Sequence, residues 1–203
     1  MKVFCIGFNK TGTTSLTDAL KRHRYKVCPQ NKGEKLCKDW AKNDFTNIIK
    51  LCERYEAFQD RPFSMPNTYK HLDKAFPNSK FILTVRSSSD EWYDSFIRFQ
   101  KKIFGGKISP NLSILKRSGY CYTGWMYDVI KSQYNTLDND LYNKERLVSI
   151  YLKHNQEVIE YFKDRPDDLL VINLKYRKSY LNFCNFLGQR KKLAKFPHVN
   201  KSR

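Results

Sequence analysis

The segment from Val3 to Leu16 constrains the fold more than any other part of the chain. It begins with an apolar run, Val3 to Ile6, which is typical of a buried parallel strand. A turn rich in small and hydroxyl side chains follows, from Gly7 to Thr14, and apolar residues at helical spacing begin at Leu16. This order of strand, glycine turn and helix brings backbone N–H groups and a helix N-terminus together. The segment therefore predicts a site for an anion.

The side chains of the turn favour a ligand over a purely structural role, although many such turns bind nothing. Lys10 adds a cation to the backbone amides. Four hydroxyl side chains fall within five residues, namely Thr11, Thr13, Thr14 and Ser15. A turn that only connects a strand to a helix needs neither feature.

The position of the lysine argues against metal–nucleotide chemistry. A Walker A loop reads G-x-x-x-x-G-K-[ST], with the lysine directly after the second glycine. Gly7 and Gly12 have this separation, and Thr14 stands where the metal-binding hydroxyl would be. Thr13, however, occupies the lysine position, and Lys10 comes before the second glycine. We interpret the turn as a site for an anionic group without the usual metal geometry.

Length, composition and charge limit the class of protein. A chain of 203 residues predicts a single domain, 1–203, and 40% hydrophobic with 15% aromatic residues excludes wholesale disorder. The formal net charge of +18 indicates anionic partners. A solvated, lysine-rich surface is the alternative explanation for part of this excess. No nucleic-acid motif accompanies the charge, so a non-catalytic polyanion-binding protein is a weaker reading.

The cysteines indicate neither a metal site nor a secreted scaffold. The chain has six, without a C-x-x-C pair or zinc-like spacing, so we expect no metal. Cys5 and Cys184 fall in apolar patterns and are expected to be packed thiols. No signal peptide and no apolar run near 18 residues is apparent. We expect a cytoplasmic protein without a membrane span.

The remaining pattern predicts an α/β protein of three layers with a mostly parallel central sheet. Strands are expected at about residues 3, 25, 57, 80 and 169, with helices between them. Gln30 to Lys35 reads as a polar connection, and Gly105 to Gly119 as a loop inside a mobile segment, 100–124. Gly188 is expected to end the last helix, before a basic tail, 189–203.

Three charged residues follow three of these strands directly. They are Lys10, Asp60 and Arg86. Ligands of parallel sheets bind beyond the carboxyl ends of the strands, where residues distant in sequence meet. The pattern therefore gathers all three residues at one edge of the sheet.

Two segments together resemble a known family. Lys-Thr-Gly-Thr-Thr after an apolar strand resembles the 5′-phosphosulfate loop of sulfotransferases that use 3′-phosphoadenosine 5′-phosphosulfate (PAPS). The segment from Lys80 to Arg86, followed by Trp92, Tyr93 and Ser95, resembles the 3′-phosphate segment of the same family. The likeness extends over most of the chain and is closest to small microbial and viral members. It is weakest between about residues 100 and 140.

The resemblance implies a P-loop-type fold, as in sulfotransferases and P-loop NTPases, and a set of roles. Lys10, with the turn from Thr11 to Ser15 (Thr11, Gly12, Thr13, Thr14 and Ser15), would hold the 5′-phosphosulfate. Lys10 would also neutralise charge on the leaving oxygen. Arg86 and Ser95 would hold the 3′-phosphate of PAPS and of the product, 3′-phosphoadenosine 5′-phosphate (PAP).

The general base has two candidates. Cytosolic relatives have a histidine where this chain has Asp60, and a carboxylate serves in related glycan sulfotransferases. Asp60 is therefore the first candidate, and an ion pair to Arg61 or Lys10 is its structural alternative. His154 is the second, although a histidine within an amphipathic helix is more often packed. The expected acceptor is a hydroxyl or amine on a small molecule or glycan. The alternative function for the chain is that of a P-loop kinase.

Overall fold

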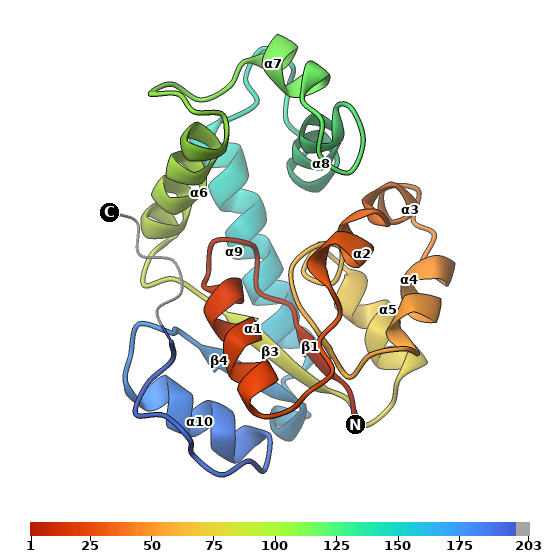
Figure 1. Ribbon diagram of the computed structural model, residues 1–203, viewed down its shortest axis with the longest axis vertical. Coiled ribbons are helices and arrows are strands. Elements are labelled where there is room, and N and C mark those ends of the chain that lie inside the picture. Colours follow the sequence, from red (N-terminus) through yellow and green to blue (C-terminus); the bar gives the residue numbers. More distant parts are fainter. Residues whose placement is uncertain (198–203) are drawn as a thin grey trace. The chain divides into compact units, whose positions relative to one another are not determined.

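The computed structural model describes residues 1–197, and the last six residues of the predicted basic tail lie outside them. Four strands form one sheet in the order β2-β1-β3-β4, and every neighbouring pair is parallel (Figure 1). Their bounds are β1 Val3–Cys5, β2 Ala57–Phe58, β3 Lys80–Thr84 and β4 Leu169–Ile172. This confirms the predicted α/β class with a parallel sheet.

The chain forms two compact units, which are described separately. The first contains Met1–Arg86 and the chain from Asn155 onward, and the second contains Ser87–His154. The first unit holds the sheet and the helices α1 Thr13–Arg22, α2 Gln30–Glu34, α3 Cys37–Ala41, α4 Thr46–Cys52, α5 Thr68–Ala75 and α10 Lys178–Phe186, with the short 3-10 helix η1 Pro166–Asp168. Helix α9 (Lys144–Tyr161) begins in the second unit and ends in the first.

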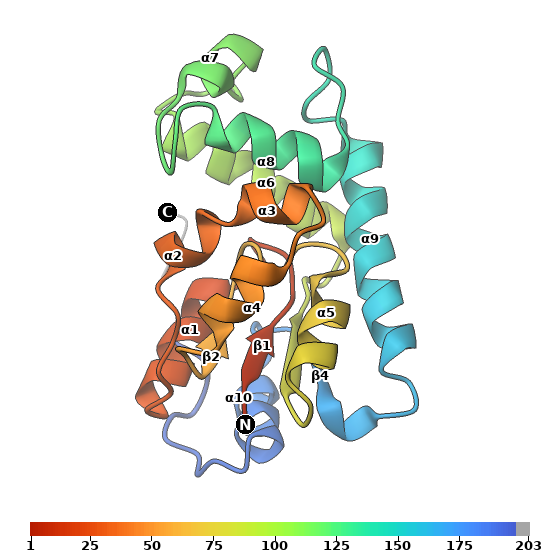
Figure 2. The same ribbon diagram turned by 90° about the vertical axis from the view of Figure 1, so that its right-hand side faces the viewer.

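The sheet is the middle one of three layers in the first unit (Figure 2). Successive residues of a strand point to opposite faces, so β1 contributes to two cores. Phe4 packs with α4, α5 and the end of α9, and its ring stacks on Phe58 and Phe81. Val3 and Cys5 instead pack with α1 and α10. Alternation in the strands thus produces a sheet with helices on both faces.

The second unit is helical and has an aromatic core. It contains α6 (Ser89–Ile103), α7 (Leu112–Arg117), α8 (Trp125–Tyr134) and the first part of α9. The ring of Trp92 on α6 stacks on Tyr151 of α9, with centroids 4.5 Å apart and planes 2° from parallel. The N-cap hydroxyl of Ser88 accepts a hydrogen bond from the Glu91 amide and begins α6.

Three predictions about local structure were wrong. The segment expected as a strand near residue 25 contributes only a bridge from Val27 to Ala57. Residues 30–34 form α2 instead of a connection, because Gly33 packs directly against Phe63 and the Arg61 carbonyl. The loop expected between residues 105 and 119 contains α7, which begins at the cap Asn111. These three segments are short or polar and show no clear hydrophobic periodicity. Their secondary structure therefore depends on tertiary contacts that the sequence pattern does not reveal.

Helix α10 ends where the sequence predicted. The described part of the tail that follows it is partly buried against the protein. Gly188 is left-handed, with φ 62°, and ends the helix as predicted. The amides of Gly188 and Gln189 donate to the carbonyls of Asn185 and Cys184, which forms a Schellman motif. Further along, Phe196 is buried against Tyr180 and Phe183.

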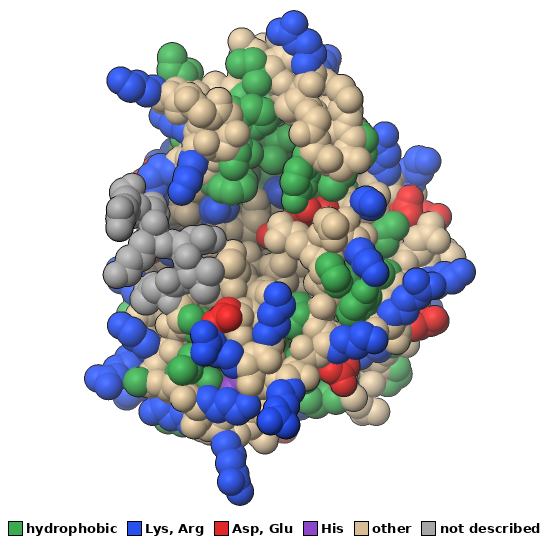
Figure 3. Space-filling model, in the orientation of Figure 1, with side chains coloured by type: hydrophobic (Ala, Val, Ile, Leu, Met, Phe, Trp, Pro, Cys, Tyr) green, Lys and Arg blue, Asp and Glu red, His purple; other side chains and the backbone are tan. Residues whose placement is uncertain are grey.

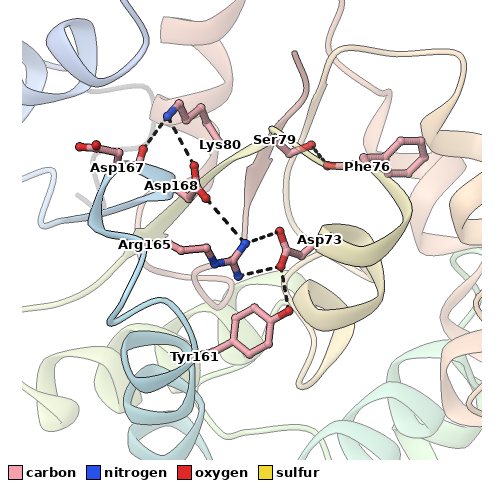
Figure 4. A network of polar contacts seen from close by, with 8 residues as sticks. All are labelled: Asp73, Phe76, Ser79, Lys80, Tyr161, Arg165, Asp167 and Asp168. Atoms are coloured by element: carbon pink, nitrogen blue, oxygen red, sulfur yellow. Dashed lines mark hydrogen bonds and ion pairs between the residues drawn. The ribbon is translucent and has the colours of Figure 1, made fainter.

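The amino-terminal edge of the sheet carries a network of ion pairs (Figure 4). The guanidinium of Arg165 lies 2.8 Å from Asp73 on α5, whose carboxylate also accepts a hydrogen bond from Tyr161. Lys80 opens β3 and donates to the Asp167 carbonyl at 2.6 Å, while its ammonium lies 3.6 Å from Asp168. These contacts join α5, the end of α9 and the segment leading into β4.

Candidate functional site

The turn between β1 and α1 lies at the carboxyl edge of the sheet. Lys10 has φ 72° and Gly12 has φ 107°, both in the left-handed region. Glycine adopts this region without strain, whereas lysine rarely does. A Cβ on Gly12 would also lie 2.5 Å from Leu174 Cδ1, in the segment after β4. Gly12 is therefore required both by the backbone conformation and by the close approach of a neighbouring segment.

Thr11 and Gly7 fix the turn against the end of β3. The Thr11 side chain is 2% exposed, and its hydroxyl donates to the Phe8 carbonyl at 2.6 Å. The same hydroxyl lies 2.5 Å from the hydroxyl of Thr84. A Cβ on Gly7 would collide with the Thr84 backbone and hydroxyl. Thr11, predicted as a cofactor contact, therefore shapes the turn through hydrogen bonds inside the protein.

Helix α1 presents its N-terminus at the end of this turn. Its first residue is Thr13, and its N-cap Gly12 provides no side-chain cap. The amides of the first turn have no acceptor within the helix, and they carry the positive end of its dipole. The first turn contains no acidic residue. Thr14 is exposed and Ser15 half-buried, so both hydroxyls are accessible at a terminus that favours an anion.

Arg86 joins this turn from the end of β3. The strand ends at Thr84, and the Arg86 Nε then donates a 2.7 Å hydrogen bond to the Lys10 carbonyl. The two cations predicted from separate segments are therefore linked through the backbone of the turn. The positive charges of Lys10 and Arg86 add to the positive electrostatic potential at the N-terminus of α1.

Asp60 approaches the same turn from the end of β2. Its side chain is 8% exposed, and Asp60 itself is left-handed, with φ 60°. Its Oδ1 accepts a hydrogen bond from the Arg61 amide at 2.9 Å. Its Oδ2 lies 3.5 Å from the Thr13 hydroxyl, which donates to it at the limit of hydrogen bonding. Lys10, Asp60 and Arg86 are thus gathered around one turn.

Ser95 and His154 belong to the second unit, where they occupy different helices. Ser95 is half-buried on α6. His154 is 1% exposed in α9. Their assigned roles, phosphate binding and base catalysis, stay predictions.

Two contributors to the turn were missed from the sequence. Thr84 holds the Thr11 hydroxyl, and its signal is a lone hydroxyl residue within an apolar strand. Leu174 closes over Gly12 from the segment after β4. No sequence pattern pointed to Leu174, because its contact exists only once β4 has joined β3.

The cysteines do not contribute to this chemistry. Within residues 1–197 none of the six forms a disulfide, and Cys5 and Cys184 are buried, as expected. Burial raises the pKa of the Cys28 thiol to about 11, which keeps it protonated at neutral pH. Among residues 1–197, no group of three histidine, cysteine or acidic side chains is arranged to hold a metal ion. Within the same residues, no helix has the length and apolar content that crossing a bilayer demands.

Comparison with known proteins is consistent with the geometry of the turn. The family model described as a sulfotransferase domain matches residues 2–203, which is nearly the whole chain. No match was found among the curated proteins. The match covers far more than half of the chain, and so the chain belongs to the sulfotransferase family.

Proposed function

We propose that this sulfotransferase takes its sulfuryl group from PAPS and transfers it to a hydroxyl or amine by in-line displacement. The observation that carries the proposal is the convergence of three chain segments on one turn. Arg86 donates to the Lys10 carbonyl, and Asp60 lies beside the Thr13 hydroxyl. The cation and the helix N-terminus would bind an anionic donor, and the carboxylate would take a proton from the acceptor.

The residues around the turn fit the 5′ end of such a donor. The first turn of α1 lacks acidic residues, and its N-cap Gly12 has no side chain that could cap the helix amides. The amides of Gly12, Thr13 and Thr14 would bind the 5′-phosphosulfate, with the Lys10 ammonium and the Thr14 hydroxyl. Thr11 acts indirectly, because its hydroxyl bonds keep the turn in shape.

PAPS, when bound, supplies the sulfuryl group and a leaving 5′-phosphate. Asp60 would accept the proton of the acceptor hydroxyl or amine on its carboxylate. Lys10 would place a positive charge beside the oxygen from which the sulfuryl group leaves. Fixed donors and cations of this kind contribute most where charge appears during the reaction. The hydrogen bond from the Arg61 amide keeps one oxygen of Asp60 in place.

Arg86 would recognise the 3′-phosphate, which distinguishes PAPS from a nucleoside triphosphate. The Arg86 Nε bonds the Lys10 carbonyl, and a guanidinium has two further nitrogens with which to grip a phosphate. This arrangement couples the two phosphate sites through one side chain. A P-loop kinase is less well supported, since Thr13 stands where the Walker lysine would be.

Isothermal titration calorimetry with PAP tests the donor. We expect PAP to bind with equal affinity in EDTA and in Mg²⁺, and more tightly than adenosine 5′-phosphate, which lacks the 3′-phosphate. Binding of ATP that requires Mg²⁺, without binding of PAP, would support the kinase and contradict the proposal. Steeply salt-dependent binding of DNA without any nucleotide binding would support a polyanion-binding protein.

The Asp60→Asn variant tests the base. The amide keeps the shape of the side chain but cannot take a proton, so we expect turnover to fall by about a hundredfold or more with PAP affinity unchanged. His154→Gln is the matched comparison for the second candidate. A larger loss of turnover in His154→Gln than in Asp60→Asn, with both variants folded, would reassign the base to His154.

We place the reaction in the cytoplasm and expect a small-molecule or glycan acceptor. The described residues include all six cysteines and no disulfide, which is in keeping with a reducing compartment. An acceptor screen with labelled donor would identify the substrate class.

A further inference from the structure

The segment 101–120 of the second unit is rich in basic residues. It contains five cations and no acidic residue, the cations being Lys101, Lys102, Lys107, Lys116 and Arg117. All except Lys101 are exposed. We call residues 101–120 the basic–apolar segment.

The same segment also exposes large apolar side chains. Ile108 is 82% exposed and Tyr120 63%, while Ile103 and Ile114 are each 42% exposed. Figure 3 shows hydrophobic and Lys or Arg side chains next to one another over the region that Figure 1 labels α7. Single exposed apolar residues are ordinary, but several within one short segment mark an interaction site.

The local structure holds these side chains outward. Leu115 is the buried anchor of α7, and the hydrogen bond from the Ile114 amide to the Asn111 side chain begins that helix. Tyr120 rests on Trp125, with ring centroids 5.1 Å apart, and still exposes most of its surface. A Cβ added to Gly105 would meet nothing within 4 Å, so this part of the segment is open to solvent.

We propose that the basic–apolar segment binds the surface of an anionic lipid bilayer. Apolar side chains that enter the headgroup region, with lysines and arginines beside them, are the features that hold peripheral proteins at such surfaces. The absence of any carboxylate in the segment favours an anionic partner, and the exposed isoleucines favour a bilayer over a soluble polyanion. Lys116 also pairs with Asp138 at 3.6 Å, so the other four cations carry the argument.

Co-sedimentation of the full-length protein with vesicles tests this proposal. We expect binding to vesicles containing phosphatidylserine, and little binding to vesicles of phosphatidylcholine alone. Ile108→Ser and the triple variant Lys101→Gln/Lys102→Gln/Lys107→Gln should each weaken binding. Each cation near an anionic surface contributes roughly fivefold in affinity, so the triple variant should bind about a hundredfold more weakly.

Matched controls separate this effect from a general change of charge or hydrophobicity. Lys35→Gln/Lys42→Gln/Lys50→Gln removes three exposed lysines elsewhere, and Ile159→Ser removes an exposed isoleucine from α9. Both controls should bind as the wild type does, because they lie outside the segment. Equal losses in control and test variants would show that only total charge matters and would overturn the proposal.

A fluorescence experiment distinguishes a bilayer from a soluble polyanion. In Ile108→Trp, we expect the added tryptophan to emit at shorter wavelength, relative to the same vesicle addition to the wild type, as it leaves water. Binding to heparin without binding to vesicles, or vesicle binding without an emission shift, would overturn the proposal. Neither readout needs a sulfuryl donor, so the result is independent of the proposed enzymatic function.

Discussion

The two edges of the parallel sheet use charged residues differently. At the amino-terminal edge, Arg165 and Lys80 meet the carboxylates of Asp73 and Asp168 in a closed network. At the carboxyl edge, the Arg86 side chain donates to a backbone carbonyl of the turn. The first arrangement joins elements to one another, whereas the second positions a loop.

The backbone differs between the two edges as well. Lys10, Gly12 and Asp60, all at the carboxyl edge, have left-handed φ values. Such conformations persist in residues other than glycine only when their surroundings enforce them, and they concentrate at functional sites. At the other edge, the turn before β3 has its left-handed residue at Asn78, a type that adopts this region readily. The comparison teaches that backbone conformation as well as charge distinguishes the edge proposed to bind the donor from the edge stabilised by ion pairs.

The largest effect is expected from Gly7→Ala at the carboxyl edge. The new Cβ would collide with Thr84 backbone atoms, which cannot move without disturbing β3. We expect the free energy of unfolding to fall by about 3 kcal/mol, measured by urea denaturation. Gly119→Ala is the matched control, because nothing lies within 4 Å of its Cβ position. Equal stability of the two variants would contradict the close contact between the turn and β3.

Single substitutions of two cations at the carboxyl edge and one at the amino-terminal edge test the comparison directly. Lys10→Ala should lower turnover by about a hundredfold or more, because fixed charge stabilisation is lost. Arg86→Ala should do the same and should also weaken PAP binding. Lys80→Ala is the control from the other edge, where only contacts to Asp167 and Asp168 are lost. A comparable loss of turnover in Lys80→Ala would show that the two edges are not functionally distinct.

A smaller effect, on stability alone, is expected from Arg165→Ala. The variant loses the pair to Asp73 and the contact of the guanidinium with the Phe162 ring. Because the side chain is 43% exposed, we expect a loss of only about 1 kcal/mol in the free energy of unfolding, with PAP affinity unchanged. Thermal denaturation at low and high salt measures it, and reduced PAP affinity would be the contrary outcome.

The smallest effect concerns pH and the far end of α1. Burial, followed by the charge of Lys192, lowers the pKa of His23. The unfolded chain then binds the proton more readily, so stability is full above about pH 6.5 and falls as the pH drops through the folded pKa. In His23→Asn, denaturation midpoints should depend less on pH in this range. An unchanged pH dependence would exclude His23 as the source and point to His71, whose pKa burial also lowers.

The sequence determined the strand–turn–helix at the start of the chain and the family it belongs to. Local information was sufficient there, because β1 is apolar and the glycines, lysine and hydroxyls have characteristic spacing. It also predicted that Lys10, Asp60 and Arg86 follow parallel strands and therefore share one edge. The end of α10 at Gly188 was equally local, since a helix terminus depends on a few consecutive residues.

Only the tertiary structure decided how the turn is held and which short segments become helices. The contacts of Thr11 with Thr84 and of Gly12 with Leu174 join residues far apart in sequence. Helix α2 forms where Gly33 packs on the Arg61 segment, and α7 is anchored by the single buried residue Leu115. A short helix is marginal by itself, so its stability comes from packing that no local pattern encodes. For the same reason, the sequence indicated the chemistry of the site but not its internal supports.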